Sequence, residues 1–350
     1  SLENGLSNDP NNTHILVTSG ANQAYMNCVL SLVSEGERCV VFAPYYFNHV
    51  MAIQMTRGDE ALCIGPMRED DGIPDLDWLR DQLEKDQKIQ QSKGKKEGKI
   101  QMVTVVNPGN PTGVSIPRER LDTLIALCKK FGVWLVMDNT YEHFDHTKDN
   151  RNSKNKNVED NSVPFQCSTQ GHVLNIFSFS KGFAMAGFRV GYVVINGCSD
   201  KSRNAYEQMV KVQDTIPICA SRISQIIALG ALSAGRDWVQ QKVSTLDPGR
   251  EAILNAIQPL QKIIGGSGAM YFMGKLPDGV SDEKSADYLV KQYGVAVIPG
   301  SYCGYPGWIR VCYSNLAPTE CKLASERLGK GIQDMCRDPE SWNSLICEES

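Results

Sequence analysis

The 350-residue sequence lacks the features that mark several specialised classes of protein. No apolar run approaches the roughly 18 residues that a membrane-spanning helix needs, and the polar segment 1–12 does not resemble a signal peptide. Basic residues are not in excess, because 36 Lys and Arg stand against 40 Asp and Glu, for a net charge of -4. These absences argue against a membrane or nucleic-acid partner and favour small-molecule partners.

Paired cysteine motifs are also missing. The twelve cysteines are scattered along the chain and include no C-x-x-C pair. In a chain of this length they are typical of reduced, mostly buried side chains rather than of a disulfide framework or a zinc site. The sequence therefore predicts a cytoplasmic protein without a bound metal.

The composition, with 41% hydrophobic and 22% charged residues, is that of a folded globular protein of about two domains. The first half alternates β-branched apolar runs with amphipathic segments, which predicts a mostly parallel sheet covered by helices. The expected strands are 14–18, 38–43, 100–106, 133–138, 172–178 and 189–195, and the expected helices are 21–34, 75–85, 117–131 and 200–212.

The pattern changes beyond Pro217. Long helical periodicity runs to Gln261, and short strands are then expected at 269–275, 295–298 and 308–313, with a last helix at 319–335. This predicts a large domain over residues 1–215 and a smaller α+β domain over 216–350. The polar segments 85–99 and 148–162 have few apolar side chains to bury, so they are expected to be solvated loops.

The stretch from Ser178 to Gly191 carries the strongest chemical signal. Lys181 follows directly after an expected strand, and Arg189 lies eight residues further on. Ligand sites in open α/β sheets lie at the carboxyl ends of the strands, and a lysine amine at such a site can form a Schiff base. For Lys181 considered by itself, a surface turn is the favoured alternative.

Three other motifs follow expected strands. Residues 19–24, S-G-A-N-Q-A, precede a helix, where free backbone N–H groups suit a phosphate, although an ordinary capped turn explains them equally well. Residues 107–113, N-P-G-N-P-T-G, make a rigid turn. Asp138 ends an apolar strand, where a carboxylate is costly to bury without a partner.

In this order and spacing, the motifs resemble those of the class I and II aminotransferases, enzymes of pyridoxal phosphate (PLP) fold type I. Ser178-x-x-Lys181 followed by Gly187-x-Arg189-x-Gly191 is similar to the family's lysine signature, and the resemblance extends from Val17 to about Met335. It implies an α/β fold with a large, mostly parallel, seven-stranded sheet and a smaller α+β C-terminal domain. It also implies a homodimer, because active sites in this family lie at the subunit interface.

The resemblance implies roles for particular residues. Lys181 would hold PLP as an aldimine, Tyr46 would stack on its ring, and Asp138 would bond the ring nitrogen. Asn110 and Tyr141 would contact the phenolic oxygen, and Arg310, assisted by Asn110, would bind the substrate carboxylate. The catalytic residues implied are Lys181, Asp138 and Tyr141, and the phosphate-binding residues are Gly20, Ala21, Asn22, Ser178 and Arg189.

The implied reaction moves the amino group of an L-amino acid to a 2-oxo acid. Residues 17–24, 44–48, 51–56, 105–111, 138–142 and 212–220 resemble plant aromatic aminotransferases that use methionine as amino donor. The family has a substantial stretch before the phosphate-binding turn, which begins here at Ser19, so the chain is expected to be short at its front. A PLP-dependent lyase or synthase, or an inactive truncated homologue with a binding role, remains an alternative.

Two interpretations of single motifs fit less well. Ser178-x-x-Lys181 also occurs in penicillin-binding proteins, but it follows an expected strand here instead of opening a helix, and Lys-Thr-Gly is absent. His143-x-x-His146 resembles a metal-binding pair, but it runs into a polar segment, so both imidazoles are expected to be exposed to solvent.

Overall fold

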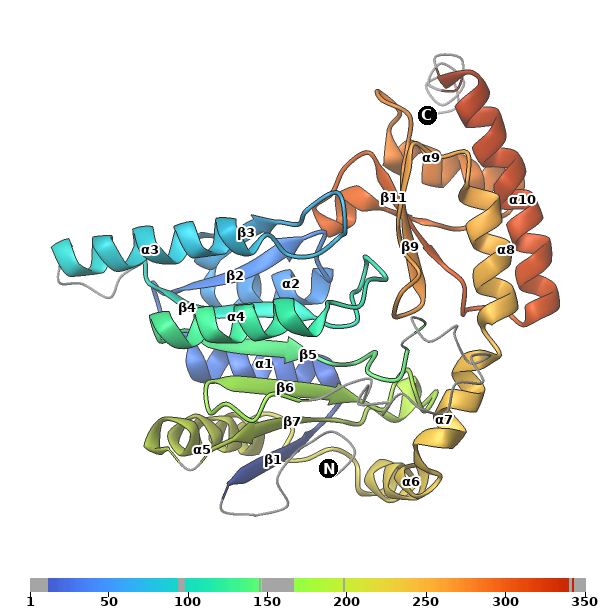
Figure 1. The fold of residues 1–350 in the computed structure, drawn as a ribbon. Coiled ribbons are helices and arrows are strands. Elements are labelled where there is room, and N and C mark those ends of the chain that lie inside the picture. The colour runs from blue at the N-terminus through green and yellow to red at the C-terminus, as the bar shows by residue number, and fades with distance from the viewer. Residues whose placement is uncertain are drawn as a thin grey trace, which may run out of the picture.

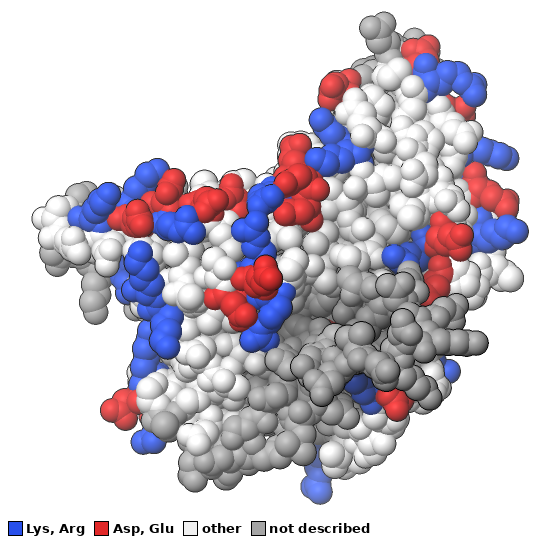
Figure 2. Space-filling model, in the orientation of Figure 1, with Lys and Arg blue, Asp and Glu red and all other residues white. Residues whose placement is uncertain are grey.

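The computed structural model describes residues 12–93, 98–144, 146, 167–197, 199–339 and 342. Within these residues no helix combines the length and the apolar character needed to cross a bilayer. Acidic and basic side chains are interspersed over the face shown in Figure 2, without a broad area of one sign.

The first part of the chain builds a seven-stranded sheet. Its strands are β1 (Thr13–Thr18), β2 (Arg38–Ala43), β3 (Leu62–Pro66), β4 (Ile100–Val106), β5 (Trp134–Asp138), β6 (Val173–Ser178) and β7 (Gly191–Asn196). They lie in the order β1-β7-β6-β5-β4-β2-β3. The five strands from β3 to β6 in this order are parallel, and β7 runs antiparallel to both β6 and β1. The expected seven-stranded, mostly parallel sheet is confirmed.

Helices cover both faces of this sheet. Side chains of α1 (Ala21–Leu32), α2 (Phe47–Arg57) and α5 (Asp200–Thr215) pack with Trp134 and Val136 of β5 on one face. Those of α3 (Leu76–Lys93) and α4 (Arg118–Phe131) pack with Leu135 and Met137 of the same strand on the other. A strand buried on both faces needs apolar residues at every position, which explains the continuous run W-L-V-M before Asp138.

The rest of the chain forms a smaller unit. Helices α6 (Arg222–Ser233), α7 (Gly235–Ser244) and α8 (Asp247–Ile257) lead to an antiparallel sheet of order β10-β11-β9-β8. Its strands are β8 (Lys262–Gly265), β9 (Tyr271–Lys275), β10 (Ile298–Pro299) and β11 (Trp308–Cys312), and helices α9 (Asp282–Tyr288) and α10 (Pro318–Arg337) complete the unit. Figure 1 shows this unit beyond the carboxyl end of β5.

Several expected elements need correction. Residues 85–93 belong to α3 and not to a loop, because Leu79 and Leu83 anchor that helix in the core and its Lys- and Gln-rich continuation has good helix propensity. Segment 148–162 lies outside the described residues. Strands β3 and β8 and helices α2 and α9 were not expected. The described cysteines are free thiols, and all except Cys219 are buried or partly buried.

The two sheets meet where two turns interlock. The turn at 107–113 lies against the turn at 265–269, with Gly268 N donating to Gly113 O at 2.9 Å and Ser115 N donating to Ser267 Oγ at 3.0 Å. Gly113 has a φ of 68°, and a Cβ atom at this position would collide with the carbonyl oxygen of Tyr271. A side chain is therefore excluded here by both the backbone conformation and the close approach of the small sheet.

Replacing Gly113 by alanine is predicted to destabilise the fold more than the same change at Gly132. Both glycines have a φ of 68°, but nothing lies near a Cβ at Gly132. Gly132→Ala therefore carries only the left-handed strain of about 1–2 kcal/mol. Gly113→Ala adds overpacking against a backbone atom, which costs a further ~1–3 kcal/mol. Urea unfolding measures the loss of unfolding free energy in each variant. Equal losses would contradict the close packing of Gly113 against the backbone of Tyr271.

Candidate active site

A cavity of about 280 Å³ lies at the carboxyl ends of β4, β5 and β6, beside the start of α1 and facing β9 and β11. This edge is where open α/β sheets bind ligands. All but one of the residues predicted to form a site line the cavity, and Gly20 lies next to it against Arg189. The lining residues are Ala21, Asn22, Tyr46, Phe47, Val106, Asn110, Asp138, Thr140, Tyr141, Ser178, Ser180, Lys181, Ala186, Arg189, Tyr271 and Arg310.

Asp138 is a buried carboxylate held by neighbouring donors. His49 Nε2 lies 3.2 Å from Oδ2, and the Thr140 hydroxyl and backbone N–H donate to Oδ1 at 2.6 and 3.0 Å. Burial by itself would raise the pKa of Asp138, but the His49 and Thr140 interactions outweigh it and keep the pKa below its ordinary value. Asp138 therefore presents a negative charge at the floor of the cavity.

The start of α1 and the loop after β6 bring together groups suited to an anion. Gly20 precedes α1 with a φ of 88°, and a Cβ there would collide with the Arg189 guanidinium. Arg189 Nη1 donates to Ala186 O at 2.8 Å, and Nη2 lies 3.5 Å from Ser19 O. No side chain caps α1 at Gly20, so the N–H groups of its first turn are available to an anion.

Lys181 begins the loop that follows β6. Its side chain is half-buried and lines the cavity. Within the described part of the chain, no carboxylate or carbonyl group makes a hydrogen bond or ion pair with its amine. The loop is closed by Ala184 N donating to Lys181 O at 3.0 Å and by Ser180 N donating to Ser178 Oγ at 3.1 Å. The fold thus presents a primary amine to the cavity without committing it to a protein partner.

Four side chains form a ring on the opposite wall. Arg310 Nη1 donates to Asn110 Oδ1 at 2.9 Å, and Asn110 Nδ2 lies 3.5 Å from the Tyr141 hydroxyl. The Tyr141 and Tyr271 hydroxyls are 2.7 Å apart. The circle of contacts is completed by the Arg310 guanidinium, which lies over the aromatic ring of Tyr271, 4.7 Å from the centre of that ring. Burial, followed by the neighbouring Tyr271, raises the pKa of Tyr141 well above its ordinary value, which keeps that hydroxyl protonated.

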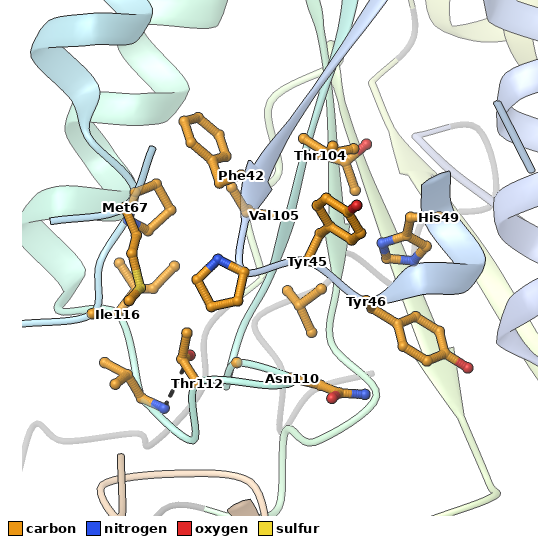
Figure 3. A pocket seen from close by; sticks show the side chains of 17 residues that line it. Phe42, Tyr45, Tyr46, His49, Met67, Thr104, Val105, Asn110, Thr112 and Ile116 are labelled. Atoms are coloured by element: carbon orange, nitrogen blue, oxygen red, sulfur yellow. Dashed lines mark hydrogen bonds between the residues drawn. The ribbon is translucent and has the colours of Figure 1, made fainter. Parts of the chain in front are cut away.

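Tyr46 forms a further wall, next to the start of α2. Its hydroxyl accepts from Asn48 Nδ2 at 2.7 Å and lies 3.4 Å from Asn22 Oδ1. Its ring stands nearly perpendicular to that of His49, at 84°. A separate cavity of about 50 Å³ lies behind Tyr46 and Asn110. Figure 3 shows this small cavity between Met67 and Ile116 on one side and Tyr46 and His49 on the other.

Three residues of the site were missed in the sequence: His49, Thr140 and Tyr271. His49 is one helical turn after Tyr46, so it would have been found if α2 had been predicted. Thr140 is two residues after Asp138, the spacing at which an Asp side chain bonds the backbone and hydroxyl that follow it. Tyr271 lies opposite Cys312, diagonal to Arg310 across two paired strands, and this pairing is visible only in the fold.

The two histidines of the His143-x-x-His146 motif are not exposed, contrary to expectation. Their side chains are 15% and 4% accessible, and those of the described His, Cys, Asp and Glu residues do not form a group of three suited to a metal. Burial, with a contribution from Arg236, lowers the pKa of His143 to about 4. Its ring packs where a Cβ on Gly182 would lie, so the motif serves packing beside the Lys181 loop.

Comparison with known proteins identifies the family. The family model "Aminotransferase class I and II" matches residues 3–328, and the chain belongs to this family of PLP-dependent enzymes. The chain is 39% identical to "Aromatic aminotransferase ISS1" of Arabidopsis thaliana over 327 residues, 93% of this chain and 76% of that protein. It is 26% identical to "Aspartate aminotransferase" of Thermotoga maritima over 301 residues, 86% of this chain and 71% of that protein.

Solved structures support the same fold. "Aspartate aminotransferase from Thermus thermophilus with maleate" matches with a TM-score of 0.77 at 24% identity, over 94% of this chain and 78% of that one. An aromatic aminotransferase from Pyrococcus horikoshii matches with a TM-score of 0.76 at 24% identity, over 95% of this chain and 82% of that one. The chain is thus an aminotransferase with the fold of fold type I PLP enzymes.

The cavity fits the cofactor that this family uses. It combines an uncommitted lysine amine, a glycine cradle beside Arg189, and a buried carboxylate whose pKa lies below its ordinary value. These three groups match the aldehyde, the phosphate and the basic ring nitrogen of PLP. Arg310 Nε, buried and without a partner in the described structure, leaves a further donor for an anionic group of the substrate.

Replacing Thr140 by valine is predicted to destabilise the protein in a pH-dependent way. Its hydroxyl bonds the ionised Asp138, so its loss costs ~1.5–3 kcal/mol at neutral pH. Because the folded pKa of Asp138 is depressed, this stabilisation is present above the unfolded value of about 3.9 and is lost as the pH falls through the folded pKa. Urea unfolding at neutral and acidic pH measures it.

The matched control for this prediction is Thr123→Val. The Thr123 hydroxyl also donates to an oxygen, at 2.8 Å, but this oxygen is the backbone carbonyl of Glu119, which does not titrate. The destabilisation in this variant is expected to be independent of pH. A Thr140→Val effect that stays constant as Asp138 becomes protonated would show that the hydroxyl does not stabilise the charged form.

Proposed function

We propose that this aminotransferase transfers the amino group of an aromatic L-amino acid or methionine to a 2-oxo acid, with PLP bound through Lys181. The observation that carries the assignment of the site is the uncommitted Lys181 amine in one cavity with Asp138, Tyr141 and Arg310. The 39% identity to an aromatic aminotransferase supports the substrate class.

The proposed cofactor site has two ends. At one end, the N–H groups of Ala21 and Asn22, the Ser178 hydroxyl and Arg189 would bind the phosphate by hydrogen bonds and by charge, and Gly20, which has no side chain, leaves room for the Arg189 guanidinium. At the other end, Asp138 accepts a hydrogen bond from the ring nitrogen and keeps it protonated. Tyr46 supports the ring by stacking, and Asn110 and Tyr141 donate to the phenolic oxygen. Bound PLP supplies an electron sink for the charge that develops at the substrate Cα.

The chain's own residues perform binding and proton transfer. Arg310 binds the substrate α-carboxylate through a guanidinium that Asn110 and Tyr271 already orient, so little conformational freedom is lost when substrate binds. Once the substrate amine has displaced it from the cofactor, the freed Lys181 amine would move a proton between the substrate Cα and the cofactor's aldehyde-derived carbon, acting as general base and then as general acid. A donor and an acceptor use the same groups in turn, which produces ping-pong kinetics.

The lining of the cavity supports an apolar or aromatic side chain on the substrate. The lining residues that remain after these assignments include Phe47, Val106 and the ring of Tyr271. The lining cations are Lys181, Arg189 and Arg310, each of which already has a role. In the described lining no further guanidinium is left for a second carboxylate. An aromatic ring or a thioether is therefore a better match than an acidic side chain.

The lyase or synthase alternative differs in its need for an acceptor. Transamination requires a 2-oxo acid for every turnover after the first, whereas elimination does not. Product analysis with methionine or phenylalanine, with and without an aromatic 2-oxo acid, separates these reactions. The proposed homodimer and cytoplasmic location remain predictions from the resemblance and the composition.

Lys181→Ala is predicted to abolish turnover and the covalent attachment of PLP. The wild-type protein mixed with PLP should show a visible absorption band that changes when methionine or phenylalanine is added, and reduction with borohydride should fix the cofactor mass on Lys181. Lys201→Ala is the control, because Lys201 lies over the ring of Trp134, 4.4 Å from its centre, outside the cavity. Intact turnover in Lys181→Ala, or no band in the wild type, would refute the proposal.

Arg310→Gln is predicted to raise KM for the amino acid by roughly 10- to 100-fold, because a charged hydrogen-bonding group contributes about 1.5–3 kcal/mol. The affinity for PLP should stay near the wild-type value, since the proposed cofactor contacts do not include Arg310. Arg310→Lys keeps the charge but loses the planar guanidinium, so its KM for the amino acid should lie between those of the wild type and Arg310→Gln. Steady-state kinetics and a PLP titration measure both, and an unchanged KM would exclude Arg310 from carboxylate binding.

A further inference from the structure

A buried glutamine on α5 joins three elements behind the cavity. Gln213 is 4% exposed, and its Nε2 donates to Val17 O of β1 at 3.2 Å. Its Oε1 accepts two hydrogen bonds from α1, from Asn27 Nδ2 at 3.0 Å and from Gln23 Nε2 at 2.5 Å. Gln23 and Asn27 are four residues apart and therefore share one face of α1. Both ends of the Gln213 amide therefore have partners within the protein.

Gln23 extends this network to the turn before α1. Its Oε1 accepts from the backbone N–H of Ser19 at 2.5 Å. Gln23 is the third residue of the helix, the position from which a glutamine side chain reaches back over the first turn in a capping box. The next peptide unit, which carries the Ser19 carbonyl, is approached by Arg189 Nη2, 3.5 Å from Ser19 O. Gln23 therefore holds the Thr18–Ser19 peptide, one unit before the Ser19–Gly20 peptide.

The rest of the turn depends on this peptide. Gly20 N donates to Thr18 O at 2.8 Å, so the two N–H groups before the helix are both occupied inside the protein. The residues that follow, Ala21 and Asn22, line the cavity. Their N–H groups belong to the first turn of α1, where helical partners are missing. The direction of these donors is set by the Ser19–Gly20 backbone and hence by Gln23 and Gln213.

We propose that Gln213 and Gln23 are positioning residues for the phosphate end of the cofactor site, acting in series on the Ser19–Gly20 turn. The inference rests on the proposed function, because it takes this turn to bind the phosphate of PLP. A buried amide without partners would be costly, and methionine has a similar shape without hydrogen-bonding groups. Substitution by methionine therefore removes the hydrogen bonds while leaving most of the packing in place.

The test compares two ligands that differ only in the phosphate. Dissociation constants of PLP and of pyridoxal are measured by titration of the cofactor-free wild type, Gln213→Met and Gln23→Met. In both variants we expect the Kd of PLP to rise by about tenfold, the size of one or two lost hydrogen bonds. The Kd of pyridoxal should change by less than about twofold, because its contacts lie at the other end of the site.

Two further variants sharpen the result. Gln225→Met is the matched control, because Gln225 is also a part-buried helical glutamine, and its amide donates to Ala220 O at 2.7 Å and not to a residue of the turn. It should change neither Kd. The double variant Gln23→Met, Gln213→Met should weaken PLP binding no more than either single variant, since the two residues act in series. Gln23 is half-buried, so its variant keeps the test decisive if Gln213→Met fails to fold.

Each outcome decides the question. A parallel rise of both dissociation constants would assign the glutamines a general structural role and overturn the inference, while the proposed function would stand. Unchanged PLP binding in both variants would also overturn it. A wild-type protein that binds PLP no more tightly than pyridoxal would instead refute the phosphate site and the proposed function together.

Discussion

The site depends on a charge buried at the end of the most buried strand. Asp138 closes β5, whose residues before it are apolar on both faces, and the carboxylate is 4% exposed. A charge in this position is tolerated only when donors replace the lost water. His49 and Thr140 provide these donors, and His49 comes from α2, which must therefore pack beside the carboxyl end of β5. The position of Tyr46 at the start of that helix follows from the same requirement.

A second constraint connects the two sheets. The turn at 107–113 cannot move without the turn at 265–269, because Gly113 lies directly against the backbone of Tyr271. The same contact region carries functional side chains, since Asn110 belongs to the first turn and bonds Arg310 of the small sheet at 2.9 Å. The group proposed to bind substrate is thus positioned by the turn proposed to contact the cofactor. The contacts that join the two sheets therefore also fix the relative positions of Asn110 and Arg310 in the site.

The sequence predicted what depends on neighbouring residues. The strands at 38–43 and 100–106 were found with the observed bounds, because each is a short apolar run between polar or turn residues. The cavity residues Lys181, Asp138 and Asn110 were expected because their motifs, each after a strand, resemble those of the aminotransferase family; position after a strand alone left a surface turn as the favoured interpretation of Lys181. Helix α2 was missed because Met51 and Met55 are exposed, at 51% and 78%, and obscure the apolar face formed by Val50 and Ile53. Strand β3 was missed because Gly65 and Pro66 are uncommon in strands.

The residues that could not be predicted are those whose positions depend on contacts with segments far away in the sequence. Tyr271 reaches Tyr141 only because β9 pairs with β11 in the register that places it opposite Cys312. His143 was expected in solvent because its sequence neighbours are polar, but its ring lies edge-on to Phe183, and Gln240 of α7 donates to its backbone oxygen at 3.0 Å. Gln213 is 190 residues from Gln23. No local pattern distinguishes this buried amide from the exposed polar residues of α5, so its connection to the turn at Ser19 becomes visible only when the network of hydrogen bonds is followed through the structure.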